Sequence, residues 1–326
     1  MITKTITKNN NHSKYYMLIL LIVFAIITII ICPFIGQYDG REILEIFRFP
    51  RVLTAFLAGF GLSLSGLIFQ NIFTNELACP YTLGVSSGAS LGVAFISYFH
   101  LSMAIHVFSL TIPSTYIGSF FGAMISVSAV YSITKYYGGF KSEILLLSGV
   151  AIGLFFSGLI LLLQYLSDAT SAINILRWTI GGIEVVGFDS FLLMLPFVVI
   201  SFIFALLNFE ELNLLSLGEE ISISRGLNVS KIRIHLFIIT SLLIAIIISE
   251  CGPIGFIGLI IPHISRLIIG YNNKFLIPFS TILGGSFLVF CDTIARTLFT
   301  NIELPVGIIT TIVGGPFFLY LLLKKK

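Results

Sequence analysis

Few side chains in this sequence belong to types that carry out bond chemistry, and none has a catalytic spacing. The five histidines form no H-E-x-x-H zinc motif, and the chain lacks the G-x-x-x-x-G-K-[ST] loop that binds nucleotide phosphates. The four cysteines form no C-x-x-C pair and lie in or beside apolar runs, as small buried hydrophobic residues do. We therefore expect no catalytic residue, no metal site, no bound cofactor and no ATP hydrolysis by this chain alone.

Three arginines stand at predicted helix ends, where they could bind an acidic partner. Arg48 and Arg51 flank Pro50, which fixes one backbone angle and presents both side chains on a stiff rim. Arg296 follows Asp292 by about one helical turn. One interpretation is snorkelling or ion pairing at helix ends, and the other is a set of cationic anchors for a partner that docks from outside. The residues alone leave both interpretations open.

The longest polar loop, residues 208–230, contains four glutamates and Arg225. Ser216 and Glu219 have the spacing of a capping box, in which the Ser216 hydroxyl accepts a hydrogen bond from the backbone N–H of Glu219. Gly226 can supply the left-handed residue that ends such a helix. We predict a short helix of about two turns, which is either a solvated connector or a docking helix for a cytoplasmic partner.

The elements that position these residues are overwhelmingly apolar. Hydrophobic residues make up 57% of the 326 residues and charged residues 10%, whereas an average globular chain is about 25% charged. A soluble domain and a disordered chain are excluded by these values, and the net charge of +3 is too small to indicate nucleic-acid binding.

A helix needs about 20 apolar residues to cross the membrane, and on that basis we predict an all-α polytopic membrane protein. The ten predicted spans are 17–35, 51–73, 83–99, 114–134, 144–166, 190–207, 230–249, 254–269, 275–295 and 305–323. The run after Pro253 is short, and the amphiphilic stretch 168–189, which contains Trp178, is expected to lie at the interface.

Lysine and arginine are distributed unevenly between the two ends of these spans. With the N-terminus in the cytoplasm, all ten lysines and three arginines lie inside, and five arginines lie outside. This bias follows the positive-inside rule and predicts that both chain ends are cytoplasmic. No linker divides the chain, so we expect one transmembrane domain over residues 17–323, with cytoplasmic tails at 1–16 and 324–326.

Glycines recur every four residues in several predicted spans. They are Gly84, Gly88 and Gly92, then Gly118 and Gly122, then Gly149 and Gly153. Small residues at this spacing let helix backbones approach closely in lipid, so we predict a compact bundle.

A series of segments between Arg48 and about Leu323 carries a resemblance to a known family. The segments are Arg48-Phe49-Pro50-Arg51, Gly66 to Gln70, Asn75 to Pro80, Leu83 to Ala89, Trp178 with Gly181 and Gly182, Leu217 to Glu220 with Gly226, Gly255 to Arg266, Asp292 with Arg296, Glu303 to Gly307, and Gly315 to Phe318. In this order they resemble the FecCD-type permease of bacterial ABC importers for iron-siderophores, haem and cobalamin, the type II importers. Glu76 and Cys79 depart from the family pattern, which usually has proline and an acidic residue there.

The resemblance implies a permease subunit of the bacterial cytoplasmic (inner) membrane. It implies a second permease subunit, identical or a paralogue, with the translocation path along their interface. Two cytoplasmic ATPase subunits would use ATP, and an extracytoplasmic binding protein would deliver the cargo. Ferric siderophore, the commonest cargo of such a family, is expected in preference to haem or cobalamin.

The resemblance also assigns roles to residues of this chain. Arg48, Arg51 and Arg296 match arginines that dock the binding protein. The loop 216–228 matches the segment that couples the permease to the ATPase, with Leu217, Gly218, Glu219, Glu220, Arg225 and Gly226 as its expected coupling residues. Ser142 and Glu143, before the fifth span, match part of the cytoplasmic gate.

Two other functions fit the sequence less well than a permease. An ion-coupled secondary transporter would need acidic residues buried near the middle of the membrane, but the acids of this chain cluster at span ends, with Glu250 and Asp292 borderline. An intramembrane hydrolase could use the G-x-S-x-G pattern at 84–88, but that pattern needs a strand-turn-helix context and lies instead on an apolar helix.

Overall fold

The structure is a computed structural model, and it describes residues 2–36, 41–80, 84–101, 104–107, 110–137, 142–299 and 303–324. Apolar runs form helices because backbone groups in lipid must find hydrogen bonds within their own segment. In chain order the helices are α1 (Ile2–Ile31), α2 (Arg41–Ile43), α3 (Phe49–Phe73), α4 (Val85–Tyr98), α5 (Ser114–Tyr137), α6 (Ser142–Leu166), α7 (Ala169–Ile180), α8 (Asp189–Leu207), α9 (Phe209–Ser216), α10 (Glu219–Ser224), α11 (Val229–Cys251), α12 (Ile257–Ile269), α13 (Asn273–Thr297) and α14 (Val306–Lys324). A 3₁₀ turn, Cys32–Phe34, follows α1, and a π-helical turn, Leu44–Arg48, leads into α3.

Each of the ten predicted spans coincides with an apolar helix. Among the described residues, seven helices are long and apolar enough to cross a membrane, and shorter apolar helices occur at Val85–Tyr98, Ile257–Ile269 and Val306–Leu319. The predicted fold class is therefore confirmed, while the number of crossings stays a prediction. A short antiparallel hairpin, β1 (Ala104–Val107) and β2 (Leu110–Pro113), is an addition that the sequence did not indicate.

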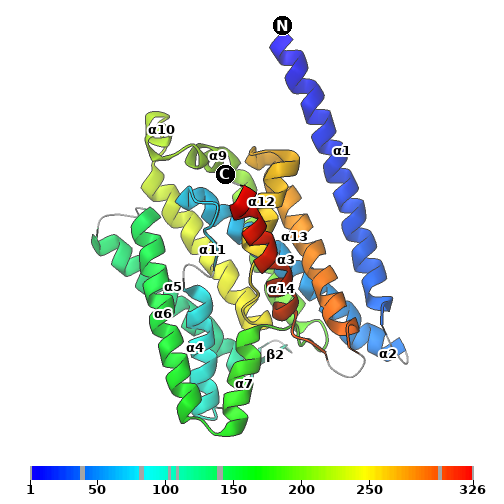
Figure 1. The fold of residues 1–326 in the computed structure, drawn as a ribbon, viewed down its shortest axis with the longest axis vertical. Helices are drawn as coiled ribbons and strands as arrows, with labels where there is room; N and C mark the ends of the chain where they lie inside the picture. Colours follow the sequence, from blue (N-terminus) through cyan, green and yellow to red (C-terminus); the bar gives the residue numbers. More distant parts are fainter. Residues whose placement is uncertain are drawn as a thin grey trace.

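The chain ends and the polar helices share one end of the bundle. Helix α1 begins and α14 ends at the same end as α9 and α10, whereas α2 and β2 lie at the opposite end (Figure 1). We call these the inner and the outer end, because the lysine and arginine distribution predicts that the first is cytoplasmic. Helix α1 extends beyond the other helices at the inner end (Figure 1), so the predicted tail 1–16 is helical from Ile2 onward.

Helix α3 lies at the centre of the bundle. It packs against α8, α11, α12 and α13, and most of its residues are buried. Glycines make its closest crossings possible: a Cβ on Gly66 would overlap the carbonyl oxygen of Gly258 in α12, and a Cβ on Gly59 would overlap that of Gly284 in α13. The backbones therefore touch at both crossings.

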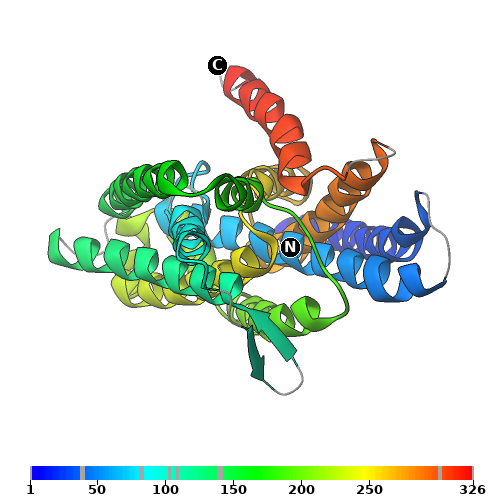
Figure 2. The same ribbon diagram turned by 90° about the horizontal axis from the view of Figure 1, so that it is seen from below.

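The glycine series of the sequence pack against one another, as predicted. Gly88 of α4 meets Gly122 of α5, and a Cβ on either would collide with the other's carbonyl group. Gly84, at the start of α4, approaches α6, where its Cβ would lie 2.8 Å from the Gly149 carbonyl oxygen. Helices α4, α5 and α6 thus form a tight group on one side of α3. By contrast, α14 leans away from the other helices (Figure 2) and contacts mainly α12 and α13.

We expect Gly66→Ala to lower the stability of the purified protein by about 1–3 kcal/mol, the usual cost of overpacking a core. Gly158→Ala on α6 is the matched control, because a Cβ there meets nothing within 4 Å. The melting temperature of each detergent-solubilised variant is measured from the loss of its size-exclusion peak after heating. Equal melting temperatures would contradict the backbone contact between α3 and α12.

Candidate functional site

A cavity of about 860 Å³ at the outer end gathers the three arginines singled out in the sequence. Arg48 and Arg51 reach it from the start of α3, and Arg296 reaches it from the last turn of α13. Glu184 and Glu303 also line this space, which we call the arginine cavity. Folding therefore brings together cations that are far apart in the sequence.

Asp292 holds two of these arginines. Arg51 Nε donates to Asp292 Oδ1 at 3.0 Å, and Arg296 Nε lies 3.2 Å from Asp292 Oδ2. Arg51 Nη1 also donates to Glu303 at 2.6 Å. The side chains of Asp292 and Arg296 are 0% and 5% exposed, and each charge would be costly to bury alone. Ion pairing is thus found for Arg51 and Arg296, while docking by the three arginines stays a prediction.

Arg48 makes contacts of another kind. Its Nη1 donates to the carbonyl oxygens of Pro33 and Ile35 at 3.0 and 2.9 Å. Arg296 Nη2 donates to the neighbouring carbonyl of Cys32 at 3.2 Å. These carbonyls follow the end of α1, where helical partners run out. The two arginines therefore fasten the outer end of α1 to the bundle.

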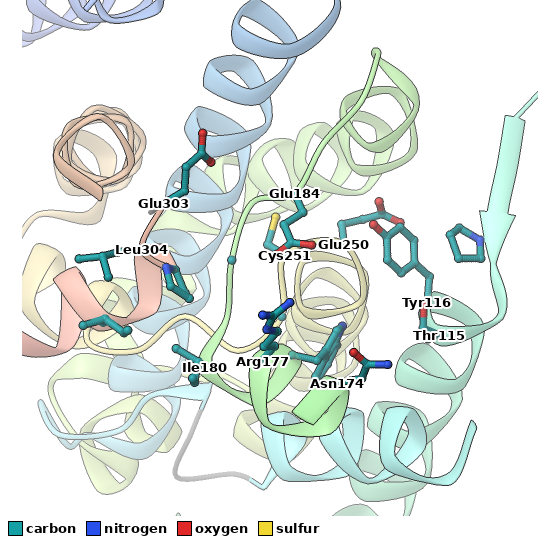
Figure 3. Close-up of a pocket in the computed structure, with 16 residues that line it drawn as sticks. Thr115, Tyr116, Asn174, Arg177, Ile180, Glu184, Glu250, Cys251, Glu303 and Leu304 are labelled. Carbon is teal, nitrogen blue, oxygen red and sulfur yellow. The ribbon is translucent and has the colours of Figure 1, made fainter. Parts of the chain in front are cut away.

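A second cavity, of about 720 Å³, lies beside the first, and we call it the mouth cavity. Its wall comes from α5, α7, the end of α11 and the segment before α14, with Tyr116, Trp178 and Glu250 among its residues. Figure 3 shows Glu184 and Glu250 above, with Arg177 rising from α7 toward them. Glu184 and Glu303 line both cavities, so they form the boundary between the two.

Backbone contacts between three helix ends build the mouth cavity. Gly182 N donates to the Cys251 carbonyl at 3.0 Å, and Gly307 N donates to the Gly181 carbonyl at 3.1 Å. Gly181 has a φ of +78°, and a Cβ on Gly307 would overlap the Ile180 carbonyl oxygen, so glycine is required at both positions. The ends of α7 and α11 and the start of α14 are therefore joined directly.

Helix α7 confirms that the amphiphilic stretch 168–189 begins with a helix. Asp168 is its N-cap and accepts hydrogen bonds from the backbone N–H groups of Thr170 and Ser171 at 3.0 and 3.2 Å. Hydrogen bonds from Ser171, and then Thr170, lower the pKa of the Asp168 carboxyl from its ordinary value. The Asp168 carboxylate therefore stays ionised at neutral pH, and its negative charge interacts favourably with the positive end of the α7 dipole.

The loop 208–230 contains two short helices, and the predicted capping box is wrong. Helix α9 ends at Ser216, whose hydroxyl donates to the Asn213 carbonyl at 2.7 Å, so Ser216 does not cap α10. Gly218, with a φ of +107°, is the N-cap of α10 instead. The predicted left-handed Gly226 is confirmed, with a φ of +83°. Ser216 does not take the predicted capping role because it is the last residue of α9.

Glu219 is used to tie α10 to α11. Its carboxylate accepts a hydrogen bond from Arg233 Nη1 at 3.1 Å, and the Arg233 side chain is only 4% exposed. Ser222, which is fully buried, donates to the Leu214 carbonyl of α9 at 2.8 Å. Of the other predicted coupling residues, Leu217, Glu220 and Arg225 are exposed at the inner end. Their coupling role stays a prediction.

An amide network that sequence reasoning missed anchors α9 to the core. Asn213 Oδ1 accepts from the backbone N–H of Asn273 at 2.8 Å, and Asn71 Nδ2 donates to Asn273 Oδ1 at 3.1 Å. Asn273 is fully buried at the start of α13. Buried polar groups in lipid need partners, so asparagines beside apolar spans were the available signal. The network connects the loop 208–230 to α3 and α13.

A second inner cluster lies between α3 and α12. Arg266 Nη1 donates to Gln70 Oε1 at 2.5 Å, and both side chains are buried. His263 Nδ1 lies 3.8 Å from Glu76, which is one of the two departures from the family pattern. The departure at Glu76 is therefore accommodated by a neighbouring imidazole.

The predicted gate residues lie at the start of α6. Glu143 is exposed in the first turn of this helix, at the inner end, and the side chain of Ser142 lies outside the described residues. Their role as a gate stays a prediction. In the described part of the chain, no group of three His, Cys, Asp or Glu side chains could hold a metal ion.

Comparison with known proteins identifies the relatives of this arrangement. The FecCD transport family matches residues 16–324. The chain belongs to this family. It is similar to the hemin transport system permease protein HmuU of Yersinia pestis, at 34% identity over 279 residues that cover 86% of this chain and 82% of that protein. It is also similar to the iron(3+)-hydroxamate import system permease protein FhuG of Bacillus subtilis, at 32% identity over 295 residues that cover 90% and 88%.

A solved structure shares the fold. It is titled as an inward-facing conformation of an ABC transporter of the metal-chelate type, and it matches with a TM-score of 0.85 and 29% identity over 95% of this chain and 99% of that one. The FecCD chain is therefore a multi-pass permease subunit of an ABC importer in the inner membrane, and the ATPase is a separate subunit. The ion-coupled transporter and the intramembrane hydrolase are excluded as readings of this chain.

Proposed function

We propose that this permease imports ferric siderophore across the cytoplasmic membrane with a second permease subunit, two ATPases and an extracytoplasmic binding protein. One observation carries the proposal. Helix α11 is continuous from Val229 to Cys251, with the Arg233–Glu219 pair at its inner end and Glu250, in the wall of the mouth cavity, at its outer end. A displacement of α10 by an ATPase would therefore move the mouth cavity through one rigid element.

The inner end supports the coupling role. The ion pair between Glu219 and Arg233 and the bond from Ser222 to α9 hold α10 to two neighbouring helices. The Asn213–Asn273–Asn71 network continues the connection to α3 and α13. ATP binding in the partner would push α10, and both routes would carry the motion into the spans. No bond chemistry is required of this chain.

The outer end supports docking of an acidic partner. The arginine cavity has three guanidinium groups against Glu184 and Glu303, with the buried Asp292 beneath them. Glu303 is exposed and already binds Arg51, so carboxylates of a binding protein would compete with Glu303 for that arginine. The Arg296 side chain is only 5% exposed, so it would act indirectly by holding Asp292 in place.

The choice of ferric siderophore is supported by chemistry as well as by relatives. A large chelate needs a wide path with few tight contacts, and the chain offers 31 phenylalanines and few charges. The second permease subunit would complete the path. Helix α14 stands apart from the other helices (Figure 2), and we propose that the second subunit packs against it.

The cargo is tested by uptake in a strain that lacks this chain. We expect the deletion to abolish entry of radiolabelled iron from a ferric siderophore, and expression of the wild-type chain to restore it. Haem and cobalamin uptake are measured in the same strains. Normal siderophore uptake together with loss of haem or cobalamin uptake would reassign the cargo.

We expect Glu219→Gln to reduce the amount of cargo transported per ATP hydrolysed by about tenfold or more. A tenfold change lies within the usual range for coupling between two linked sites. The substitution removes the carboxylate charge that pairs with the buried Arg233 and loosens α10 from α11. Glu210→Gln, on α9, removes a glutamate that is exposed in the same loop and is the matched control. Transport and ATP hydrolysis are measured with the complete importer in liposomes. Full coupling in Glu219→Gln would refute the role of the pair.

Docking is tested by affinity for the binding protein, measured with the complete importer in nanodiscs. We expect Arg48→Gln to weaken binding by about tenfold and to flatten its salt dependence, because a charge facing the partner is lost. Glu303→Gln should have the opposite effect, since it releases Arg51. Lys135→Gln, at the inner end, controls for net charge. Unchanged affinity in both outer variants would rule out docking at the arginine cavity.

A further inference from the structure

The mouth cavity has an excess of acidic side chains. Three glutamates, Glu184, Glu250 and Glu303, line it, against the single cation Arg177. Glu303 is paired with Arg51 of the neighbouring cavity. Glu184 and Arg177 are both exposed, and neither is in an ion pair within the described residues. The exposed carboxylate of Glu184 is therefore accessible to a ligand, and Glu250 adds a buried carboxyl group to the same wall.

Glu250 is buried and incompletely satisfied. The residue is 5% exposed, and its Oε2 has no hydrogen-bond partner among the described residues. Ser190 is within hydrogen-bonding reach of the carboxyl group, and Asp189 adds a further negative charge nearby. A buried oxygen without a partner is costly, so this group in the wall of a cavity calls for an explanation, such as a ligand that completes its hydrogen bonds. The carboxyl group turns toward Tyr116 across the cavity wall (Figure 3).

The other groups of the wall suit a cation. Trp178 and Tyr116 present aromatic surface beside the carboxylates, and protonated amines bind at aromatic faces as well as at carboxylates. An anionic ligand would instead meet the exposed carboxylate of Glu184 at short range, where like charges repel each other. Discrimination against a ligand is commonly built from such like charges.

We infer that the mouth cavity selects ferric chelates that carry a protonated amine and discriminates against chelates with free carboxylates. The inference rests on the proposed function and names the charge class of the cargo. Glu250 provides the hydrogen-bond acceptor, Glu184 the accessible charge, and Trp178 and Tyr116 the aromatic surface. Ferric citrate and haem carry carboxylates, so the cavity would disfavour their uptake.

The test uses three chelates that share one iron-binding core and differ in the group on a single terminal nitrogen, which sets their charge. Ferrioxamine B has a free amine, its N-acetyl derivative is neutral, and its N-succinyl derivative carries a carboxylate. Uptake of radiolabelled iron from each is measured in the deletion strain carrying wild-type, Glu250→Gln, Glu184→Gln or Glu45→Gln protein. Glu45, exposed before α3, lies outside the cavity and is the matched control. The binding protein and ATPase are the same in every strain, so a changed ratio reports on this chain.

We expect the wild-type protein to favour the amine-bearing chelate over the succinylated one. The ratio of these two uptake rates should fall about fivefold in Glu184→Gln, as expected for removing one nearby charge from a partly solvated site. It should also fall in Glu250→Gln, because Glu250 provides the second carboxyl group of the wall. Glu45→Gln should keep the wild-type ratio. A ratio cancels a uniform loss of protein, and immunoblots of the membrane fraction confirm the amount of each variant.

Each other outcome overturns a defined claim. A ratio that is unchanged in both cavity variants, or a wild-type preference for the succinylated chelate, would overturn this inference and leave siderophore import intact. If none of the three chelates enters through the wild-type chain, this inference fails, while the proposed function is still decided by the uptake assay with other ferric siderophores.

Discussion

Helix α3 can act as the axis of this bundle because its backbone touches those of α12 and α13 directly. Helices in lipid gain little from burying apolar side chains against one another, so close contact between backbones must provide the attraction. Gly66 with Gly258, and Gly59 with Gly284, remove the Cβ atoms that would prevent this contact. With the crossings set, residues at both ends of α3 can reach partners on its neighbours.

The few charges of the chain are placed at those ends. At the outer end Arg51 of α3 binds Asp292 of α13, and at the inner end Gln70 of α3 binds Arg266 of α12. Arg233 and Glu219 make a similar link between α11 and α10. Because buried charges must be paired, each of these contacts permits essentially one arrangement of its helices. The pairs therefore connect the surfaces where partners are proposed to bind with the helices that would move.

The two outer cavities are adjacent because they share part of their walls. Glu184 and Glu303 belong to both walls, so a change in the arginine cavity alters the charge at the mouth. Displacement of Glu303 from Arg51 by a docking partner would leave a free carboxylate beside the start of α14. Binding of a partner and entry of a cargo would therefore depend on the same two glutamates. The segment that bears Glu303 is joined to the end of α7 by the hydrogen bond from Gly307 to Gly181, and that end is joined to α11 by the hydrogen bond from Gly182 to Cys251.

Hydropathy over about 20 residues and glycine at four-residue spacing are local properties, so the fold class and the positions of the apolar helices could be predicted from the sequence. It also singled out Arg48, Arg51 and Arg296 and the loop that contains α10. How these residues are used depends on contacts between helices that are far apart in the chain. Ser216 lost its predicted capping role because α9 continues through it, and Arg296 became buried because Asp292 and the end of α1 surround it. Likewise, Glu250 became a wall of the mouth cavity only when the ends of α7, α11 and α14 met. Such pairings join residues distant in the chain, and no local pattern encodes which helix end will lie beside which.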